Sequence, residues 1–134
     1  AAPPAPPKKI LCPVNNTPAA REALKAALWF EESFGSDLTV VHVPETRPER
    51  AIDDICSWVP EAARPHCSIR EIAGNADADH AILTLAREEG SDLLVIGSQH
   101  RRFFDSTVLG STTARVVRHA PCPVLTVPAP SDAV

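Results

Sequence analysis

The feature that most constrains the fold is an alternation of short apolar runs with longer segments of helical period. The apolar runs predict five strands, at residues 9–14, 38–43, 67–73, 92–96 and 123–127. Helices are predicted at residues 18–34, between Pro48 and Pro60, and at residues 77–89 and 110–119. Strands separated by helices indicate a parallel sheet, because parallel strands need crossover connections.

Right-handed crossovers leave few topologies for a sheet of this kind. We expect a doubly wound α/β fold with a five-stranded parallel sheet in the order 3-2-1-4-5 and helices on both faces. Strands 1 and 4 are then neighbours, and the winding of the chain reverses between them. Such folds bind ligands in the crevice at the carboxyl ends of these strands. Function is therefore expected in the loops at residues 13–17 and 97–109.

The second of these loops carries the residues best suited to holding an anion. Gly97 follows the strand and allows a ligand to approach the backbone. Gly110 and Ser111 open the next helix, where unpaired amides and the helix dipole favour a phosphate. Hydroxyl donors follow at Ser111, Thr112 and Thr113. The alternative is a capped helix after a strand that ends in glycine, with no ligand, and spacing alone favours neither interpretation.

The stretch from Gly97 to Thr113 resembles the G-x2-G-x9-G-[ST] loop of ATP-binding universal stress proteins. Four other segments resemble the same family in the same order. KKILCPVNNTPAAREAL is similar to its opening strand and helix, VVHV to its second strand, SDLLVIGS to its fourth and APCPVLTVP to its last. The resemblance covers the chain from Lys8 to Pro128, which is identified as a member of the universal stress protein (UspA-like) family.

The resemblance implies which residues would bind ATP. The end of the first strand and the second strand would contact the nucleoside, and the two ends of the loop would contact the phosphates. The implied positions are Pro13, Val14, Asn15 and Val43 for the nucleoside, and Gly97, Gln99, His100, Gly110, Ser111, Thr112 and Thr113 for the phosphates. Mg²⁺ is expected only together with ATP.

Two of these positions depart from the family's pattern. Asn15 stands where ATP-binding members carry an aspartate, so it keeps an acceptor but lacks the charge that would hold a ribose hydroxyl or a metal-bound water. His100 stands where the loop's second glycine belongs, and its side chain would narrow the phosphate cradle. Protonated His100 with Arg101 and Arg102 would offer charge to a phosphate, whereas the simpler interpretation is a solvated loop face. We expect nucleotide binding that is retained but weakened.

Composition restricts the partners and the compartment. The formal net charge of −4 argues against binding to nucleic acid or to an acidic membrane surface. No apolar run approaches the roughly 20 residues that span a bilayer. The proline-rich residues 1–7 and the tail at 129–134 are interpreted as linkers around one domain at residues 8–128.

The cysteines indicate a cytoplasmic protein with reduced and mostly buried thiols, because a chain with this much core-forming sequence does not need a disulfide framework. None of the four forms a CxxC pair of the kind that binds metal. The four are Cys12, Cys56, Cys67 and Cys122. In the expected strand order Cys12 and Cys122 would lie two strand spacings apart, about 9–10 Å, which is too far for a disulfide.

No motif indicates catalysis or a metal site. Asp77, Asp79 and His80 fall in the first turn of a helix, where acidic residues are expected because of the helix dipole. His42 is interpreted as a histidine that is satisfied within the sheet.

Two glutamates and two tryptophans in the predicted helices are interpreted as structural residues. Glu31 and Glu32 are expected at the solvated end of the first helix. Trp29 and Trp58 are interpreted as packing residues, since tryptophan usually contributes buried area.

The last strand predicts a partner. PVLTV would lie at the sheet edge, where an exposed apolar strand invites pairing with another chain. The resemblance implies the same, because family members dimerise through their closing strands. We therefore expect a homodimer formed through residues 123–127.

Three functions are compatible with these residues. The first, which we expect, is a stress-response regulatory module with a degenerate ATP-binding loop. The alternative is a dimeric interaction module of the same family that binds no nucleotide. The resemblance implies this alternative because family members that lack the full loop typically do not bind ATP. The third is a slow ATPase or phosphotransfer enzyme, which the lack of a positioned base disfavours.

Overall fold

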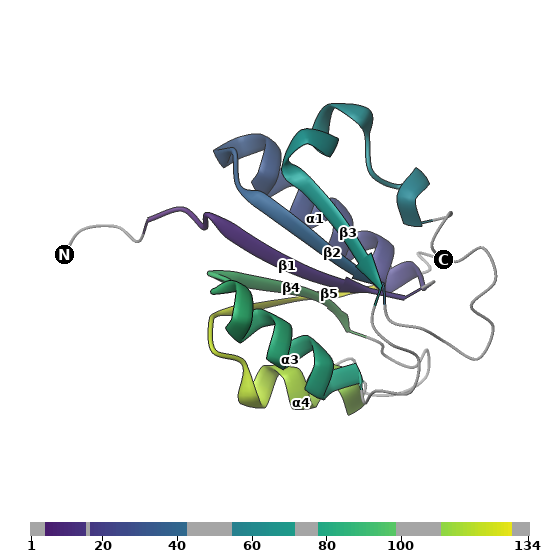
Figure 1. Cartoon of the computed structure of the whole chain (residues 1–134). Helices are drawn as coiled ribbons and strands as arrows, with labels where there is room; N and C mark the ends of the chain where they lie inside the picture. The colour runs from purple at the N-terminus through teal and green to yellow at the C-terminus, as the bar shows by residue number, and fades with distance from the viewer. Residues whose placement is uncertain (1–4, 16, 43–54, 72–77, 99–110, 130–134) are drawn as a thin grey trace.

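The chain folds around one five-stranded parallel sheet (Figure 1). The computed structural model describes residues 5–15, 17–42, 55–71, 78–98 and 111–129. The strand order is β3-β2-β1-β4-β5 and every neighbouring pair is parallel, which confirms the predicted fold and order. The elements are β1 Lys9–Val14, α1 Pro18–Phe34, β2 Asp37–His42, a 3-10 helix η1 Glu61–His66, β3 Cys67–Glu71, α3 Ala78–Glu89, β4 Leu93–Ser98, α4 Ser111–His119 and β5 Val124–Pro128.

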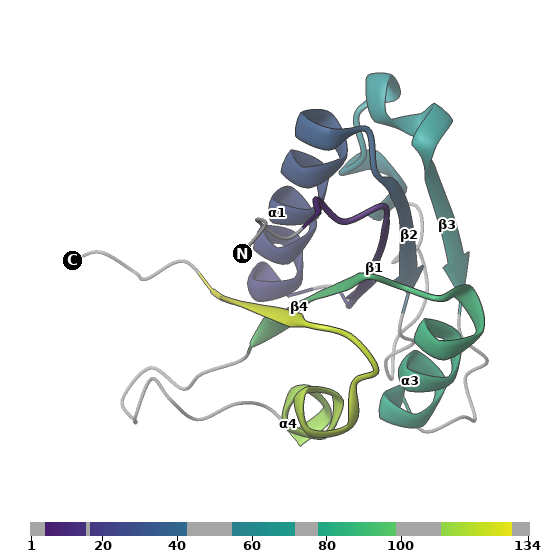
Figure 2. The ribbon, with the colours of Figure 1, turned by 90° about the vertical axis from the view of Figure 1, so that its left-hand side faces the viewer.

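Helices cover both faces of the sheet, as predicted. Helix α1 lies on one face, and α3 and α4 lie together on the other (Figures 1 and 2). Each face has its own cluster of buried apolar side chains. The arrangement follows from strands that are apolar on both sides, because each side then has to be covered by a helix. None of the helices in the described ranges is long and apolar enough to cross a membrane.

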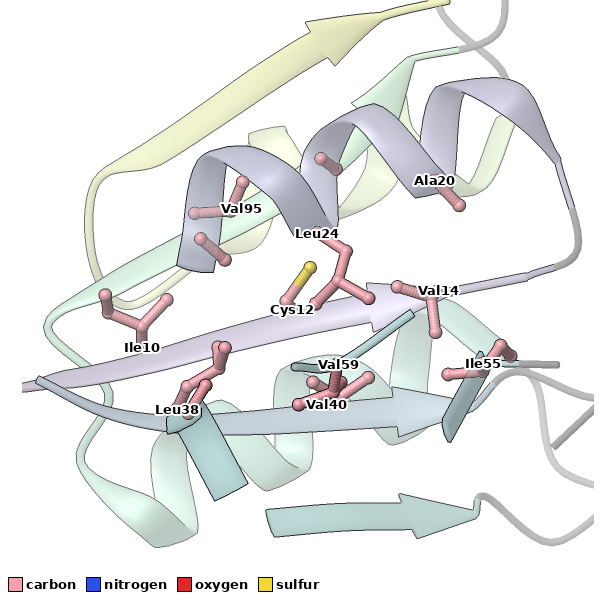
Figure 3. Close-up of a cluster of buried hydrophobic side chains, with 13 residues drawn as sticks. Ile10, Cys12, Val14, Ala20, Leu24, Leu38, Val40, Ile55, Val59 and Val95 are labelled. Atoms are coloured by element: carbon pink, nitrogen blue, oxygen red, sulfur yellow. The ribbon is translucent and has the colours of Figure 1, made fainter. Parts of the chain in front are cut away.

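The core beneath α1 combines small helix residues with branched strand residues (Figure 3). Ala20, Ala23 and Ala27 are at most 4% exposed and let the helix axis approach the sheet closely. Larger side chains such as Leu24 and Val40 fill the space between the helix and the strands. Close packing of this kind makes the distance between helix and sheet sensitive to single atoms.

Both ends of α1 lie where the sequence predicts them. The Thr17 hydroxyl accepts a hydrogen bond from the Ala20 amide at 3.2 Å, and Pro18 occupies the first helical position. Gly35 ends the helix in the left-handed conformation with φ 68°, and its amide donates to the Glu31 carbonyl at 2.8 Å.

Several predicted boundaries shift in the structure. Strand β4 continues to Ser98, so Gly97 lies within the strand and not in the loop. Strand β3 is described as far as Glu71, and β5 includes Pro128, which an edge strand tolerates. Of the helix predicted between Pro48 and Pro60, residues 55–57 are helical and residues 48–54 lie outside the described ranges. The 3-10 helix η1 was not predicted, because its sequence has two nearby prolines and no helical period.

Two predictions about side-chain burial are wrong. Trp29 is 56% exposed, and it packs edge-on against Phe30 with ring centroids 5.0 Å apart. Glu31 is 8% exposed, because its spacing from Leu24 and Ala27 puts it on the core side of α1. The companion predictions are confirmed.

The predictions for the second glutamate and the second tryptophan are the confirmed ones. Glu32 is exposed, and Trp58 packs against the core. The Arg21 guanidinium lies 5.6 Å from the centroid of the Trp58 ring, within the range of a cation–π contact. Trp58 thus joins the residues before β3 to the outer side of α1.

The four cysteines are unpaired, as predicted, but only Cys12 is fully buried. Burial raises the pKa of the Cys12 thiol far above its ordinary value. Burial, with a smaller contribution from the Glu31 carboxylate, raises the pKa of Cys67 to about 11. Neither thiol is therefore activated as a nucleophile.

Asp92, which directly precedes β4, fixes the start of β1. Its carboxylate accepts hydrogen bonds from the amides of Lys8 and Lys9, at 2.9 and 3.0 Å. These two hydrogen bonds hold the pKa of the Asp92 carboxyl below its ordinary value. A carboxyl whose pKa is lower in the folded state stabilises the fold at neutral pH and loses that effect when it is protonated.

We predict that Asp92→Asn lowers the free energy of unfolding at pH 7 and that the difference from wild type is smaller at about pH 3. The reason is that the stabilisation begins to fall below about pH 4, where aspartate is protonated in the unfolded chain, and disappears once the pH is below the lowered pKa of folded Asp92. Urea unfolding of both proteins at the two pH values measures the difference. An equal difference at both would show that the charge is not involved.

Candidate functional site

The candidate site is the carboxyl edge of the sheet, where β1 and β4 lie side by side. The two strands pair in register at Ile10–Leu93 and Leu11–Leu94. From β1 the chain enters α1 on one face, whereas β2 lies on the other side of β1 from β4. The winding of the chain therefore reverses between β1 and β4, as predicted, and the residues that leave both strands meet at this edge.

Asn15 leaves β1 in a fixed conformation. Its side-chain Oδ1 accepts a hydrogen bond from the Thr17 hydroxyl at 2.6 Å, and its carbonyl accepts one from the Thr17 amide at 2.9 Å. The Thr17 hydroxyl in turn accepts from the Ala20 amide. One lone pair of the Asn15 Oδ1 is therefore engaged within the fold, and a ligand can meet the amide Nδ2 as donor and the second lone pair of Oδ1 as acceptor. The two residues before it, Pro13 and Val14, are buried in β1.

Gly97 is enclosed by the first turn of α1. A Cβ atom at this position would lie 2.7 Å from the Ala19 carbonyl carbon and 2.8 Å from both the Ala19 oxygen and the Ala20 nitrogen. These are backbone atoms, which cannot move aside as the tip of a flexible side chain can. Packing by itself thus requires glycine here, and contact between Gly97 and a nucleotide stays a prediction.

Thr113 connects α4 to the end of β4. Its hydroxyl donates a hydrogen bond to the Gly97 carbonyl at 2.9 Å, and the residue is 6% exposed. The structure thereby brings together two predicted site residues that are 16 positions apart in the sequence. Because this hydroxyl proton is already donated, phosphate donors in the first turn of α4 are better sought among its backbone amides and at Thr112, which is half-buried.

Several predicted site residues lie outside the described ranges. These are Val43, Gln99, His100 and Gly110, together with Arg101 and Arg102. Ser111 begins α4, but its side chain is not described.

His42 is a polar residue of this edge whose environment the sequence did not reveal. It is 1% exposed, and neither ring nitrogen has a hydrogen-bond partner among the described residues. The Glu71 carboxylate lies 3.8 Å from Nδ1, beyond hydrogen-bond distance. Within the described residues, the prediction of a satisfied sheet histidine is therefore wrong. The sequence feature that could have indicated this environment is a histidine at the end of an otherwise largely apolar strand.

The acidic turn of α3 is structural in the described residues. Asp79 lies in the first turn of α3, with its carboxylate 3.8 Å from the Arg115 guanidinium of α4, whereas His80 is exposed. Asp77 lies outside the described ranges. Among the side chains that the structure describes, no three are placed to hold a metal ion together.

Two hollows in the described structure lie at the opposite, amino end of the sheet. One, of about 530 Å³, is lined by residues 5–8, Phe30, Leu93 and Pro123 among others. The second, of about 380 Å³, lies between the starts of β1 and β2 and the end of α3. Neither includes Asn15, Gly97 or Thr113. The candidate site is therefore defined by the ends of β1 and β4 and the start of α4.

We predict that Gly97→Ala lowers the free energy of unfolding by about 1–3 kcal/mol, since the added methyl group forces α1 away from β4. Gly90→Ala is the matched control. Gly90 has φ 65°, and a methyl group added there would meet nothing within 4 Å, so only its left-handed backbone opposes the substitution, at about 1 kcal/mol. Urea unfolding of both variants tests the contact. A smaller effect at Gly97 than at Gly90 would contradict it.

Comparison with known proteins gives a consistent result. A sequence model described as the universal stress protein family matches residues 6–128. The chain is 26% identical over 144 residues to universal stress protein YxiE of Bacillus subtilis, covering 89% of this chain and 97% of that protein. The structure of UspA from Lactobacillus plantarum is similar with a TM-score of 0.68 at 26% identity, covering 92% of this chain and 99% of that one.

Some similar folds were solved with a nucleotide. One is the universal stress protein from Archaeoglobus fulgidus in complex with dAMP, which is 21% identical with a TM-score of 0.62 and covers 90% of this chain and 96% of that one. At this identity the likeness concerns the fold.

Proposed function

This chain belongs to the universal stress protein family, and we propose that within it the protein is a stress-response regulatory module that binds an adenine nucleotide at the carboxyl edge of its sheet. The observation that carries the proposal is the 2.9 Å hydrogen bond between the Thr113 hydroxyl and the Gly97 carbonyl. It holds the first turn of α4 beside the end of β4, so that the amides of that turn open next to the strand that neighbours β1. Amides at the start of a helix favour a phosphate.

In this proposal the nucleoside lies against the ends of β1 and β2, and the phosphates lie against the loop and α4. The residues involved are Pro13, Val14, Asn15 and Val43, followed by Gly97, Gln99, His100, Gly110, Ser111, Thr112 and Thr113. The dAMP complex of a similar fold supports a nucleotide as the ligand class. ATP is the nucleotide that the resemblance implies, with Mg²⁺ only as its companion.

Asn15 sets a limit on how the nucleotide is held. The side chain is neutral, and its Oδ1 already accepts one hydrogen bond from Thr17, so it offers a ligand the Nδ2 donor and one further lone pair but no charge. A ribose or phosphate oxygen can accept from Nδ2, whereas a metal ion would meet a neutral oxygen instead of a carboxylate. We therefore expect affinity lower than an aspartate at this position would give for Mg²⁺-bound ATP.

A second candidate is a dimeric module of the same family that binds no nucleotide. The observation in its favour is that packing alone explains both residues. A side chain at Gly97 would collide with the backbone of α1, and the Thr113 hydroxyl already donates a hydrogen bond within the fold.

We also propose a cytoplasmic location, which the four unpaired cysteines support.

We predict saturable binding of ATP or ADP to the wild-type protein in calorimetry, and binding at least about tenfold weaker in Ser111→Val. Valine removes a hydroxyl donor and crowds the first amides of α4, and one charge-assisted hydrogen bond corresponds to about tenfold in affinity. Ser68→Val, the same change at an exposed position of β3, is the control and should bind normally. Absence of heat at millimolar nucleotide would favour the module that binds none.

We further predict a homodimer that forms through β5. The strand is at the edge of the sheet, with β4 on one side and Leu125 38% exposed. Leu125→Lys should shift the mass in light scattering at micromolar concentration from dimer to monomer, because a charge on an edge strand opposes pairing. Val117→Lys, on exposed α4, is the matched control and should remain dimeric. A monomeric wild-type protein would refute the dimer.

A further inference from the structure

The position of His42 puts a buried imidazole at the edge of the sheet where the nucleotide is proposed to bind. His42 is the last residue of β2 and is level with Val14 of β1 and Glu71 of β3. Side chains alternate along a strand, so His42 lies on the same face as Leu38 and Val40, which is the face that α1 covers. Asn15 follows Val14 directly. The imidazole thus lies one strand away from the point where Asn15 leaves the sheet.

The environment of His42 is unfavourable for a purely structural residue. It is 1% exposed, and both ring nitrogens lack a hydrogen-bond partner in the part of the chain that the structure describes. A buried polar group without a partner destabilises a fold, whereas an apolar side chain of similar size does not. The preceding residues of β2, Val40 and Val41, show that this strand accommodates apolar side chains. An unsatisfied imidazole at this edge therefore requires another explanation, and a ligand supplies one.

We infer that His42 recognises the base of the nucleotide, an inference that rests on the proposed function. The Glu71 carboxylate, 3.8 Å from Nδ1, favours the tautomer with its proton on Nδ1. Nε2 is then an acceptor. An acceptor selects a base that presents an amino group, as adenine does, over hypoxanthine, which carries a carbonyl oxygen at the same position.

Burial of the ring has a consequence for this recognition. To meet the base, the imidazole turns toward the sheet edge or the base is enclosed beside it. In both cases the hydrogen bond is shielded from water, where it discriminates more strongly than at the surface. A site that hydrogen-bonds one group of a ligand rejects the analogue lacking it, because the buried partner is left unsatisfied.

The test compares AMP with inosine monophosphate by calorimetry on three proteins. The two bases differ at this group and at the neighbouring N1, which is an acceptor in adenine and carries a proton in hypoxanthine, so the change of preference in the variants is the measurement that identifies His42. Wild-type protein should bind AMP about tenfold more tightly or better. His42→Gln places an amide near the position of Nε2, and because an amide can accept from an amino group or donate to a carbonyl, this variant should lose most of the preference while still binding both nucleotides. His42→Asn reaches only the position of Nδ1 and should bind both nucleotides equally. Thermal unfolding of each protein verifies that the variants are folded.

A third variant separates recognition from packing. His42→Leu removes both ring nitrogens and should unfold at the same or a higher temperature, because no hydrogen bond is lost. A large fall in its unfolding temperature would show that the imidazole is satisfied in the fold, and would overturn the inference.

The outcomes distinguish this inference from the function on which it rests. If wild-type protein binds neither nucleotide, the proposed function fails and the role of His42 fails with it. If wild-type protein binds both equally, prefers the inosine nucleotide, or keeps its preference in His42→Asn, the role of His42 alone is refuted and nucleotide binding stands.

Discussion

The contact between Gly97 and the first turn of α1 is the constraint on which the candidate site depends. With no Cβ, the strand approaches the backbone of Ala19 and Ala20 to a distance that no other residue permits. The same peptide group accepts the hydrogen bond from Thr113 on the opposite layer. One residue of β4 therefore fixes both the helix that follows β1 and the helix that follows β4. The spacing of the starts of α1 and α4 at the sheet edge is a product of core packing.

The sequence contains enough information for the architecture. Thr17–Pro18 and Gly35 delimit α1 because capping depends on a few local atoms, and the apolar runs predict the sheet because strands buried on both faces need them. The burial of individual helix residues was less predictable. Trp29 is exposed because it lies opposite the core side of α1, whereas Glu31 is buried because it follows the spacing of Leu24. In both cases position on the helix decided burial, and side-chain chemistry did not.

For the candidate site, too, the sequence predicted the topology but not the environment of individual atoms. The topology brings Asn15, Gly97 and Thr113 to one edge, as the order of elements predicts. Which of their polar atoms are still available depends on distances of tenths of an ångström, and no pattern of residue types contains these. Oδ1 of Asn15 and the hydroxyl of Thr113 are both engaged within the fold. The sequence also did not predict that the His42 imidazole lacks a hydrogen-bond partner among the described residues, because a buried histidine usually has one.

The central position of β1 also bears on the order in which the chain can fold. Its pairing with β2 joins segments close together in the sequence, such as Lys9 and Asp37, but its pairing with β4 joins Ile10 to Leu93. During synthesis on the ribosome, β1, α1 and β2 can assemble early, while the other edge of β1 has no strand to pair with until β4 emerges. Long-range parallel pairing is slow, and an apolar strand waiting for its partner is open to wrong association. The first strand to be made is therefore among the last to have both of its edges paired.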